Sequence, residues 1–394
     1  MDIIHYFEPF KGCIEAISGF YLEDAFESQI SFFDGEAEWF ADFKGEVVII
    51  GVPESRNSPD NKGCSNAADN IRKYLYALSA FDEKLVIGDA GNLKGNSIND
   101  KYQALQEVIT FFNSRGVVVL LLGGSQDLTL PVLKGMLDID SRDSVNIAVG
   151  DAMLDIDSRE EDFSSLSWLS FLINGLNLNL GDLTVFGTQK YLISNMQERF
   201  LKNNFFDILR LGELRGENIS RVEVPLRDAD LVSIDFRMIK GQPQFKSSIA
   251  SPHGIDAHDA CRVMRYCGMS DKVMTVGIFE VPNENIGYYN NYLLAAEMCW
   301  HFIDGFLGRQ NDAPDDYSGK YKKYIVPLEG LDKPLVYYQN IVNERWWFND
   351  PLGDLNEVIA CNREDYRLSL RNEIPSKWWR LFMRKTYLEK QKGN

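Results

Sequence analysis

The sequence predicts an α/β protein, a three-layer αβα sandwich around a mainly parallel, doubly wound sheet of about eight strands. Short runs rich in β-branched residues alternate with helix-length amphipathic segments over most of the chain. Several of these runs, such as residues 117–122, are apolar without alternation, which is typical of strands covered on both faces. With 394 residues, the chain is long enough to bury a large core without disulfides.

Each element is expected where an apolar run or an amphipathic segment is bounded by turn-forming residues. The clearest strands are residues 46–51, 84–88, 117–122, 144–149, 183–186, 207–211, 229–235 and 273–280. The helices expected between them are residues 66–80, 100–115, 127–138, 189–203, 256–268 and 289–309.

The chain divides into three parts by composition. Residues 1–45 are aromatic and acidic, and we expect them to cover one edge of the sheet. Residues 46–312 form the α/β domain, which ends in a polar stretch typical of a linker. Residues 313–394 no longer alternate cleanly, and this C-terminal extension is expected to pack on the domain or on a partner.

Charge and cysteine content exclude several classes of protein. The 41 basic and 58 acidic residues give a formal charge of −17, which argues against broad nucleic-acid binding. The longest apolar run is too short for a transmembrane segment, and the first residues lack the features of a signal peptide. The six cysteines are scattered without a CxxC pair. We therefore expect a cytoplasmic protein with reduced thiols.

Carboxylates follow four of the expected strands. Asp127 comes after the third strand, Asp151 and Asp155 after the fourth, Asp235 ends the seventh, and Glu280 ends the eighth. In an open parallel sheet these ends meet at one edge, where ligands bind. A cluster of unpaired carboxylates repels itself, so it requires a metal, another cation or shared protons.

These strand ends resemble the ureohydrolase superfamily, which includes arginases, agmatinases and formimidoylglutamases. The likeness extends over residues 47–308, and its clearest stretches are residues 47–53, 61–72, 87–92, 254–256 and 280–282. It implies an arginase-like αβα fold. It also implies hydrolysis of linear amidines by a hydroxide bridging two manganese ions. The family's ligand motifs are Gly-Gly-Asp-His, Asp-Ala-His-x-Asp and Ser-x-Asp-x-Asp, and residues 123–126, 151–155 and 233–237 match their order and spacing.

Half of the implied ligands are replaced in this chain. Ser125 and Gln126 stand where the family has Asp and a ligand His, Met153 replaces a second ligand His, and Arg237 replaces a ligand Asp. The flap histidine expected after the second motif is missing from residues 164–169. The ligands that remain are Asp151, Asp155 and Asp235. The resemblance therefore implies a divergent member with a degraded binuclear manganese site.

The two metal positions differ in what remains. One ion, Mn²⁺ or Mg²⁺, would have Asp151, Asp155 and Asp235, with the Gln126 amide oxygen as a possible fourth ligand. The other position would present a thioether and a guanidinium, and a permanent cation cannot ligate a metal. We expect no cofactor. The alternative is a single Mn²⁺ or Mg²⁺ ion.

Arg237 is expected to replace the metal charge. Its side chain would reach into the former metal cavity and pair with Asp151, Asp155 or Asp235, while Met153 would fill the space of the lost imidazole. In the alternative arrangement, Arg237 turns outward into solvent and a metal lies between the aspartates.

The leading functional hypothesis is a catalytically inactive member that binds a partner protein or a small ligand. Glu280 matches the family's substrate-binding carboxylate and is the residual ligand-binding candidate, and no residue is assigned a catalytic role. The alternative is an active amidine or guanidine C–N hydrolase that uses a single metal. A third hypothesis places other chemistry at Cys261 or Cys267, although buried structural thiols are the commoner case.

The basic, aromatic stretch at residues 375–385 is a candidate docking element. Trp378, Trp379 and Arg380 are residue types favoured at binding hot spots, and the stretch could also contact an anionic membrane. Packing onto the chain's own acidic body, or onto a neighbouring subunit, is the favoured alternative. The resemblance also implies a homo-oligomer, since family members commonly form trimers or hexamers.

Overall fold

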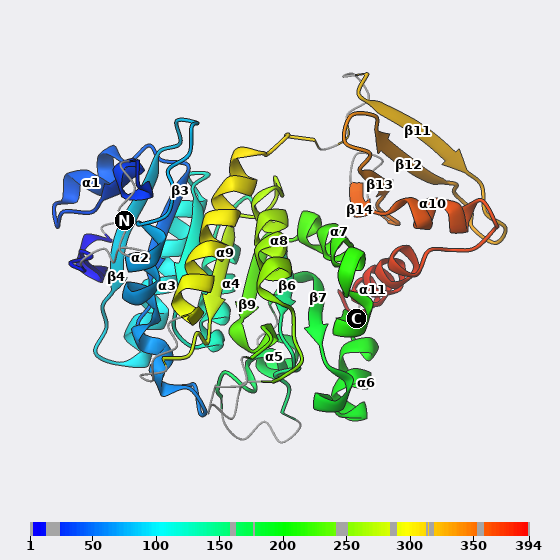
Figure 1. Ribbon diagram of the computed structural model, residues 1–394. Helices are drawn as coiled ribbons and strands as arrows, with labels where there is room; N and C mark the ends of the chain where they lie inside the picture. Colours follow the sequence, from blue (N-terminus) through cyan, green and yellow to red (C-terminus); the bar gives the residue numbers. More distant parts are fainter. Residues whose placement is uncertain are drawn as a thin grey trace.

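The computed structural model describes residues 3–12, 24–157, 163–175, 178–241, 251–283, 290–312, 314, 319–352 and 358–392. Cys13 and most of the expected linker after residue 312 lie outside these ranges. Within them, ten strands form one large sheet flanked by helices (Figure 1). These strands are β1 (Phe7–Glu8), β2 (Ile30–Phe32), β3 (Val47–Gly51), β4 (Ile87–Leu93), β5 (Val118–Leu122), β6 (Val145–Gly150), β7 (Leu180–Thr188), β8 (Asp207–Arg210), β9 (Leu231–Asp235) and β10 (Thr275–Phe279).

The order of the strands is that of a doubly wound sheet. It runs β1-β4-β3-β5-β10-β9-β6-β7-β8, and β2 also pairs with β4. All pairings along this path are parallel except β1 with β4, so the predicted αβα fold with its mainly parallel sheet is confirmed. The helices flanking the sheet are α1 (Ala37–Asp42), α2 (Ala67–Leu75), α3 (Ile98–Asn113), α4 (Thr129–Leu137), α5 (Trp168–Ser170), α6 (Asn195–Asn203), α7 (Glu223–Asp228), α8 (Ala257–Gly268) and α9 (Asn290–Leu307).

The core consists of two apolar layers, one on each face of the sheet. Val47 and Ile49 of β3 belong to the layer that includes α2, α8 and α9, whereas Val48 and Ile50 belong to the layer with α3 and α4. Strands β3, β5, β9 and β10 are buried along their whole length. Their uninterrupted apolar sequences follow from this two-sided burial.

The strand expected at residues 84–88 lies further along the chain, as β4. It includes polar residues because Asp89, although buried, accepts hydrogen bonds from the buried Arg72 at 2.8 and 2.9 Å. Asn92 accepts a third bond from Arg72, at 2.6 Å. The short strands β1 and β2, which precede β3 in the sequence, both pair with β4.

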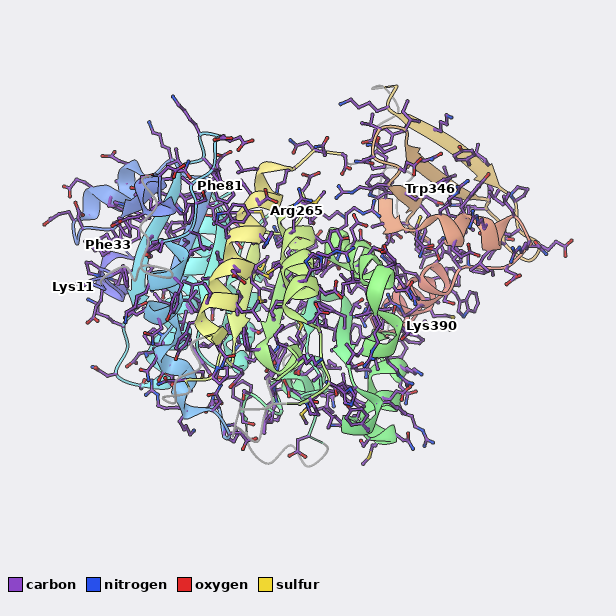
Figure 2. The ribbon with its side chains drawn as sticks, in the orientation of Figure 1. Lys11, Phe33, Phe81, Arg265, Trp346 and Lys390 are labelled. Atoms are coloured by element: carbon purple, nitrogen blue, oxygen red, sulfur yellow. The ribbon has the colours of Figure 1, made fainter. Side chains whose placement is uncertain are left out.

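The C-terminal extension forms a second, smaller sheet (Figure 1). It is antiparallel, in the order β11 (Tyr321–Val326), β12 (Leu335–Asn340), β13 (Trp346–Asn349) and β14 (Val358–Cys361). Two helices follow, α10 (Arg363–Ser369) and α11 (Ser376–Lys392). One face of the sheet packs with these helices around Tyr337, Trp346, Phe348 and Trp378. Figure 2 labels Trp346 in this part of the molecule.

The other face of this sheet lies against α7 of the large domain. Trp347 lies under the guanidinium of Arg227, 4.5 Å from the ring centroid, and packs near Val224. Asp228 accepts a hydrogen bond from the backbone nitrogen of Ala360 at 2.9 Å, and it forms an ion pair with Lys377 at 2.6 Å. The C-terminal extension therefore packs on its own chain through specific polar contacts.

None of the described helices is both long and apolar enough to cross a membrane.

Candidate functional site

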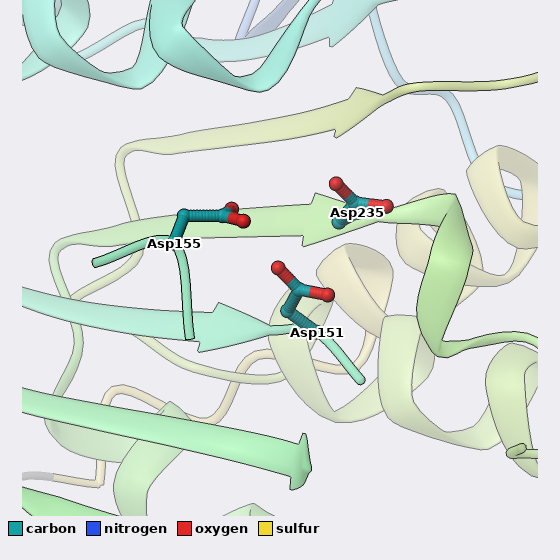
Figure 3. Close-up of side chains that lie close together, drawn as sticks. All are labelled: Asp151, Asp155 and Asp235. Carbon is teal, nitrogen blue, oxygen red and sulfur yellow. The ribbon is translucent and has the colours of Figure 1, made fainter. Parts of the chain in front are cut away.

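Three aspartates come together where β6 and β9 end (Figure 3). The two strands pair in parallel with Gly150 opposite Ile234, so the next residues, Asp151 and Asp235, are neighbours at the same edge. Asp155 approaches from the loop after β6. One carboxylate oxygen from each residue lies within 4.8 Å of the others, and all three side chains are buried. We call Asp151, Asp155 and Asp235 the aspartate triad.

The side chain of Arg237 points into the aspartate triad. Its Nη2 atom lies 2.6 Å from Asp235, 3.1 Å from Asp155 and 3.4 Å from Asp151. A tight turn at Phe236–Met238 directs it there, because Asp235 accepts bonds from both the backbone nitrogen and Nε of Arg237. Arg237 is thus ion-paired and buried, in the orientation expected from the sequence and not in the solvent-facing alternative.

Met153 lies beside this guanidinium. Its sulfur is 3.9 Å from Nη1 of Arg237, and its backbone nitrogen donates to Asp151 at 3.1 Å. A thioether is a weak acceptor and a soft ligand, so it tolerates a guanidinium at van der Waals distance.

Gln126 faces the triad from the turn after β5. Hydrogen bonding is satisfied when its amide nitrogen donates to Asp155 at 2.8 Å and to Asp235 at 3.2 Å, while its oxygen accepts from Ser233. In this orientation Gln126 is a donor to the carboxylates. The expectation that its oxygen serves as a metal ligand requires the opposite orientation.

Trp168 supplies a further donor, which the sequence analysis did not identify. Its indole Nε1 donates to Asp155 at 3.1 Å, and its ring is fully buried. It lies in α5, within the segment where the family flap histidine was sought. A tryptophan there was visible in the sequence, but its partner depends on the packing of the loop after β6.

Electrostatics agree with this arrangement. Burial raises the pKa of Asp151 well above its usual range, and the charges of Asp155 and Asp235 add to the rise against the opposing effect of Arg237. Burial likewise raises the pKa of Asp155. Burial alone would lower the pKa of Arg237, but the three aspartates outweigh it and keep the guanidinium charged. Arg237 therefore supplies the counter-charge of a triad in which burial favours the neutral form of the carboxyl groups.

Glu280 lies next to this cluster, directly after β10, and is buried. It accepts hydrogen bonds from Ser58 Oγ at 2.8 Å and from the backbone of Gln126 at 3.3 Å. Its backbone has φ +56°, which is uncommon for a residue with a side chain. Burial raises the pKa of Glu280 to about 7, and the charge of Asp235 contributes.

Asp127 does not join the triad, although it follows β5, which runs parallel to β9 and is separated from it by β10. Its carboxylate accepts hydrogen bonds from the hydroxyl of Tyr102 and, at 3.2 Å, from Asn57. Asp127 therefore belongs to a separate buried polar group beside the strand edge.

A binuclear manganese centre does not fit these side chains as they are arranged. The Arg237 guanidinium lies within hydrogen-bonding distance of carboxylates that would otherwise hold the ions. Met153 and Gln126 direct a thioether and an amide donor to the site. A single ion would have three carboxylate ligands only if Arg237 moved away.

Comparison with known proteins places the chain in a family. The model of the arginase family matches residues 45–303, which is more than half of the sequence. The chain belongs to the arginase family. No curated protein sequence matches it significantly.

Solved structures similar to this arginase-family chain share its fold. Formiminoglutamase from Trypanosoma cruzi with Mn²⁺ has 19% identity and a TM-score of 0.61, covering 68% of this chain and 95% of its own. Formimidoylglutamase from Bacillus subtilis has 20% identity and a TM-score of 0.61, covering 74% and 95%. Agmatine ureohydrolase of Thermoplasma volcanium has 17% identity and a TM-score of 0.57, and the match covers 74% of this chain and 96% of that protein. About a quarter or more of this chain therefore has no counterpart in these neighbours.

The remaining candidate residues have structural positions. Burial raises the pKa of Cys261 to about 12 and also raises that of Cys267, so both thiols are protonated at neutral pH. Trp378 is buried in the C-terminal core, and Arg380 forms an ion pair with Asp182. Of the three proposed docking residues, Trp379 is the exposed one, with 45% of its surface accessible.

Proposed function

We propose that this arginase-family chain is a pseudoenzyme that acts by binding and does not hydrolyse amidines. The observation that carries the proposal is the Arg237 guanidinium seated among Asp151, Asp155 and Asp235. A metal-bound hydroxide forms because a divalent ion lowers the pKa of its bound water to about 7. An arginine lacks this Lewis acidity, and a divalent ion beside it would be repelled.

We propose further that the ligand is a small molecule with an amine or amidine group. Glu280 is a buried carboxylate that accepts hydrogen bonds from the neutral groups of Ser58 and Gln126. A carboxylate in such a setting gains most from a cationic partner, with which it can form charge-assisted hydrogen bonds. A protein partner docking through the C-terminal extension has less support, because Trp378 and Arg380 are used within the chain.

The second candidate function is hydrolysis with one metal ion. The favouring observation is that the triad oxygens lie within 4.8 Å of one another, a spacing suited to a hard cation. This function requires Arg237 to leave its three partners when the ion binds.

Metal analysis and turnover separate the two functions. The purified chain is equilibrated with excess Mn²⁺, desalted, and analysed for bound metal, and is then assayed on formimidoylglutamate, agmatine and arginine. We expect substoichiometric manganese and no turnover. One tightly held ion per chain, with turnover that is lost in Asp235→Ala, would instead establish the hydrolase.

Ligand binding is tested separately by thermal shift with agmatine and arginine. We expect stabilisation of the unaltered chain, and loss of that stabilisation in Glu280→Gln. Equal responses in both proteins would show that Glu280 does not recognise the cation.

A further inference from the structure

We propose that Arg237 is a built-in structural cation, and that its removal converts the aspartate triad into a site for one divalent metal ion. This inference deepens the proposed function and rests on its metal-free site. It concerns what holds the strand ends together, which turnover assays do not measure.

Arg237 joins two parts of the chain that are distant in sequence. Its guanidinium contacts Asp151 and Asp155 in the loop after β6, at sequence separations of 86 and 82 residues. It contacts Asp235 at the end of β9 through both Nε and Nη2. A single guanidinium thus bridges the ends of two adjacent strands, as a shared metal ion would.

The triad depends on this one guanidinium for fixed positive charge. Among the described residues, the ion pairs of Asp151, Asp155 and Asp235 are all made by Arg237. Without it, three buried carboxylates would face one another with no counter-charge. That situation is costly unless protons or another cation enter.

The remaining groups would keep the triad in place after Arg237 is removed. Trp168 donates to Asp155, and Gln126 can donate to Asp155 and Asp235. The backbone of Met153 donates to Asp151. Rotation of the Gln126 amide would also offer an oxygen in place of a donor. Oxygen ligands held at short range are those that Mn²⁺ and Mg²⁺ prefer.

The test compares the unaltered chain with Arg237→Ala by thermal unfolding in EDTA and in Mn²⁺. We expect the midpoint of the unaltered chain to be the same in both solutions. The midpoint of Arg237→Ala should be lower in EDTA and rise by several degrees with Mn²⁺. Titration followed by the electron paramagnetic resonance of free Mn²⁺ should find one bound ion per chain in the variant.

Three further variants make the result specific. Arg237→Ala combined with Asp151→Asn should lose the manganese response, because one ligand is gone. Arg380→Ala also removes a largely buried arginine from a carboxylate, yet it should not respond to Mn²⁺ because Asp182, among the described residues, belongs to no cluster of three potential metal ligands. If Arg237→Ala does not fold, Arg237→Gln keeps a donor near Asp235 without the charge and takes its place.

Two results would overturn the inference. The first is stabilisation of the unaltered chain by Mn²⁺. The second is a folded Arg237→Ala or Arg237→Gln that binds no manganese. If the folded variants bind no manganese, and the unaltered chain neither holds metal nor turns over substrate, this inference fails but the proposed function is still supported. Turnover by the unaltered chain with Mn²⁺ would refute the proposed function itself.

Discussion

The guanidinium of Arg380 and the carboxylate of Asp182 form a two-bond ion pair across 198 residues of sequence. Nη1 lies 2.5 Å from Oδ1, and Nη2 lies 2.9 Å from Oδ2. Nη1 also donates to the carbonyl of Phe205 at 2.8 Å. Because Asp182 lies in β7 and Arg380 in α11, this pair holds the C-terminal helix against one end of the large sheet.

Replacing Arg380 by alanine should destabilise the protein by about 3 kcal/mol, because it leaves the largely buried Asp182 without its cation. Denaturant unfolding of the purified variant measures this loss. Arg367→Ala is the matched control, since its pair with Glu364 on α10 is more than half exposed on both sides and should change stability by less than about 1 kcal/mol. Equal effects would mean that the Arg380 pair does not anchor α11.

Docking of α11 should weaken in acid. Burial alone would raise the pKa of Asp182, but the charge and hydrogen bonds of Arg380 outweigh it and hold the pKa below its usual value. Burial would also raise the pKa of Asp228, but the charges of Lys377 and Lys272 outweigh it and lower that pKa. Such carboxyls hold fewer protons in the folded state than in the unfolded chain. The stability that these two ionised carboxylates contribute is therefore fully present above about pH 4, the pKa of aspartate in an unfolded chain. It is lost as the pH falls through their lower pKa values in the folded protein.

The measurement is the free energy of unfolding between pH 6 and pH 3. Asp182→Asn should be less stable than the unaltered chain at pH 6, and its stability should fall less steeply toward pH 3. Parallel pH profiles for the two proteins would contradict the assignment of this acid sensitivity to Asp182.

Trp168→Phe should destabilise the protein by roughly 1.5–3 kcal/mol, because phenylalanine keeps an aromatic ring at this buried position but lacks the indole N–H that donates to Asp155. The control is Trp300→Phe, whose indole donates to the backbone carbonyl of Ser79 at an exposed position. That change should cost less than about 1 kcal/mol. Urea unfolding of both variants measures these losses of stability. If Trp168→Phe is as stable as the unaltered chain, the indole N–H does not stabilise the triad.

Gln126→Glu should destabilise the protein by more than about 2 kcal/mol at pH 8, because a further carboxylate would then face those of Asp155 and Asp235 in a buried site. Gln103→Glu is the control. It also places a carboxylate beside an existing one, Glu107, but on the exposed surface of α3, where the cost should be about 0.5 kcal/mol. A Gln126→Glu protein as stable as its parent would indicate that a metal ion lies in the triad in addition to the Arg237 guanidinium.

Most of the large domain could be predicted from sequence because its strands are covered on both faces. The run at β5 is apolar throughout, and its residues are buried without exception. β4 was misplaced because Asp89 and Asn92 look like turn residues in sequence. Their place in a strand depends on Arg72, which reaches them from α2.

The residues of the candidate site could be predicted from the sequence, but the orientation of their side chains could be predicted only in part. Motif spacing located the triad, and the orientation of Arg237 followed from the need to balance buried charge. The donor role of Gln126 was not foreseen, since an amide can present either its oxygen or its nitrogen. Trp168 contacts Asp155 because of how the loop after β6 packs, and a loop has no periodic sequence pattern from which that contact could be predicted.

The small C-terminal sheet was not predicted, because its strands do not show a simple alternation. Tyr337 and Tyr338 are adjacent and both are buried, one under the C-terminal helices and the other toward the large domain. The burial of Tyr338 depends on α7, a helix of a different part of the chain. Local sequence therefore gave no sign of which side of each strand would be covered.

The contacts of α11 also set an order of events during synthesis. The carbonyls of Leu180, Gly181 and Asn204 accept hydrogen bonds from Arg384, which is made long after them. At about 5–20 residues per second, the ribosome needs on the order of 10–40 s to add the intervening segment. Until then these three carbonyls lack their Arg384 donor. A nascent chain therefore passes through a stage in which this part of the sheet is open to chaperones or to wrong pairing.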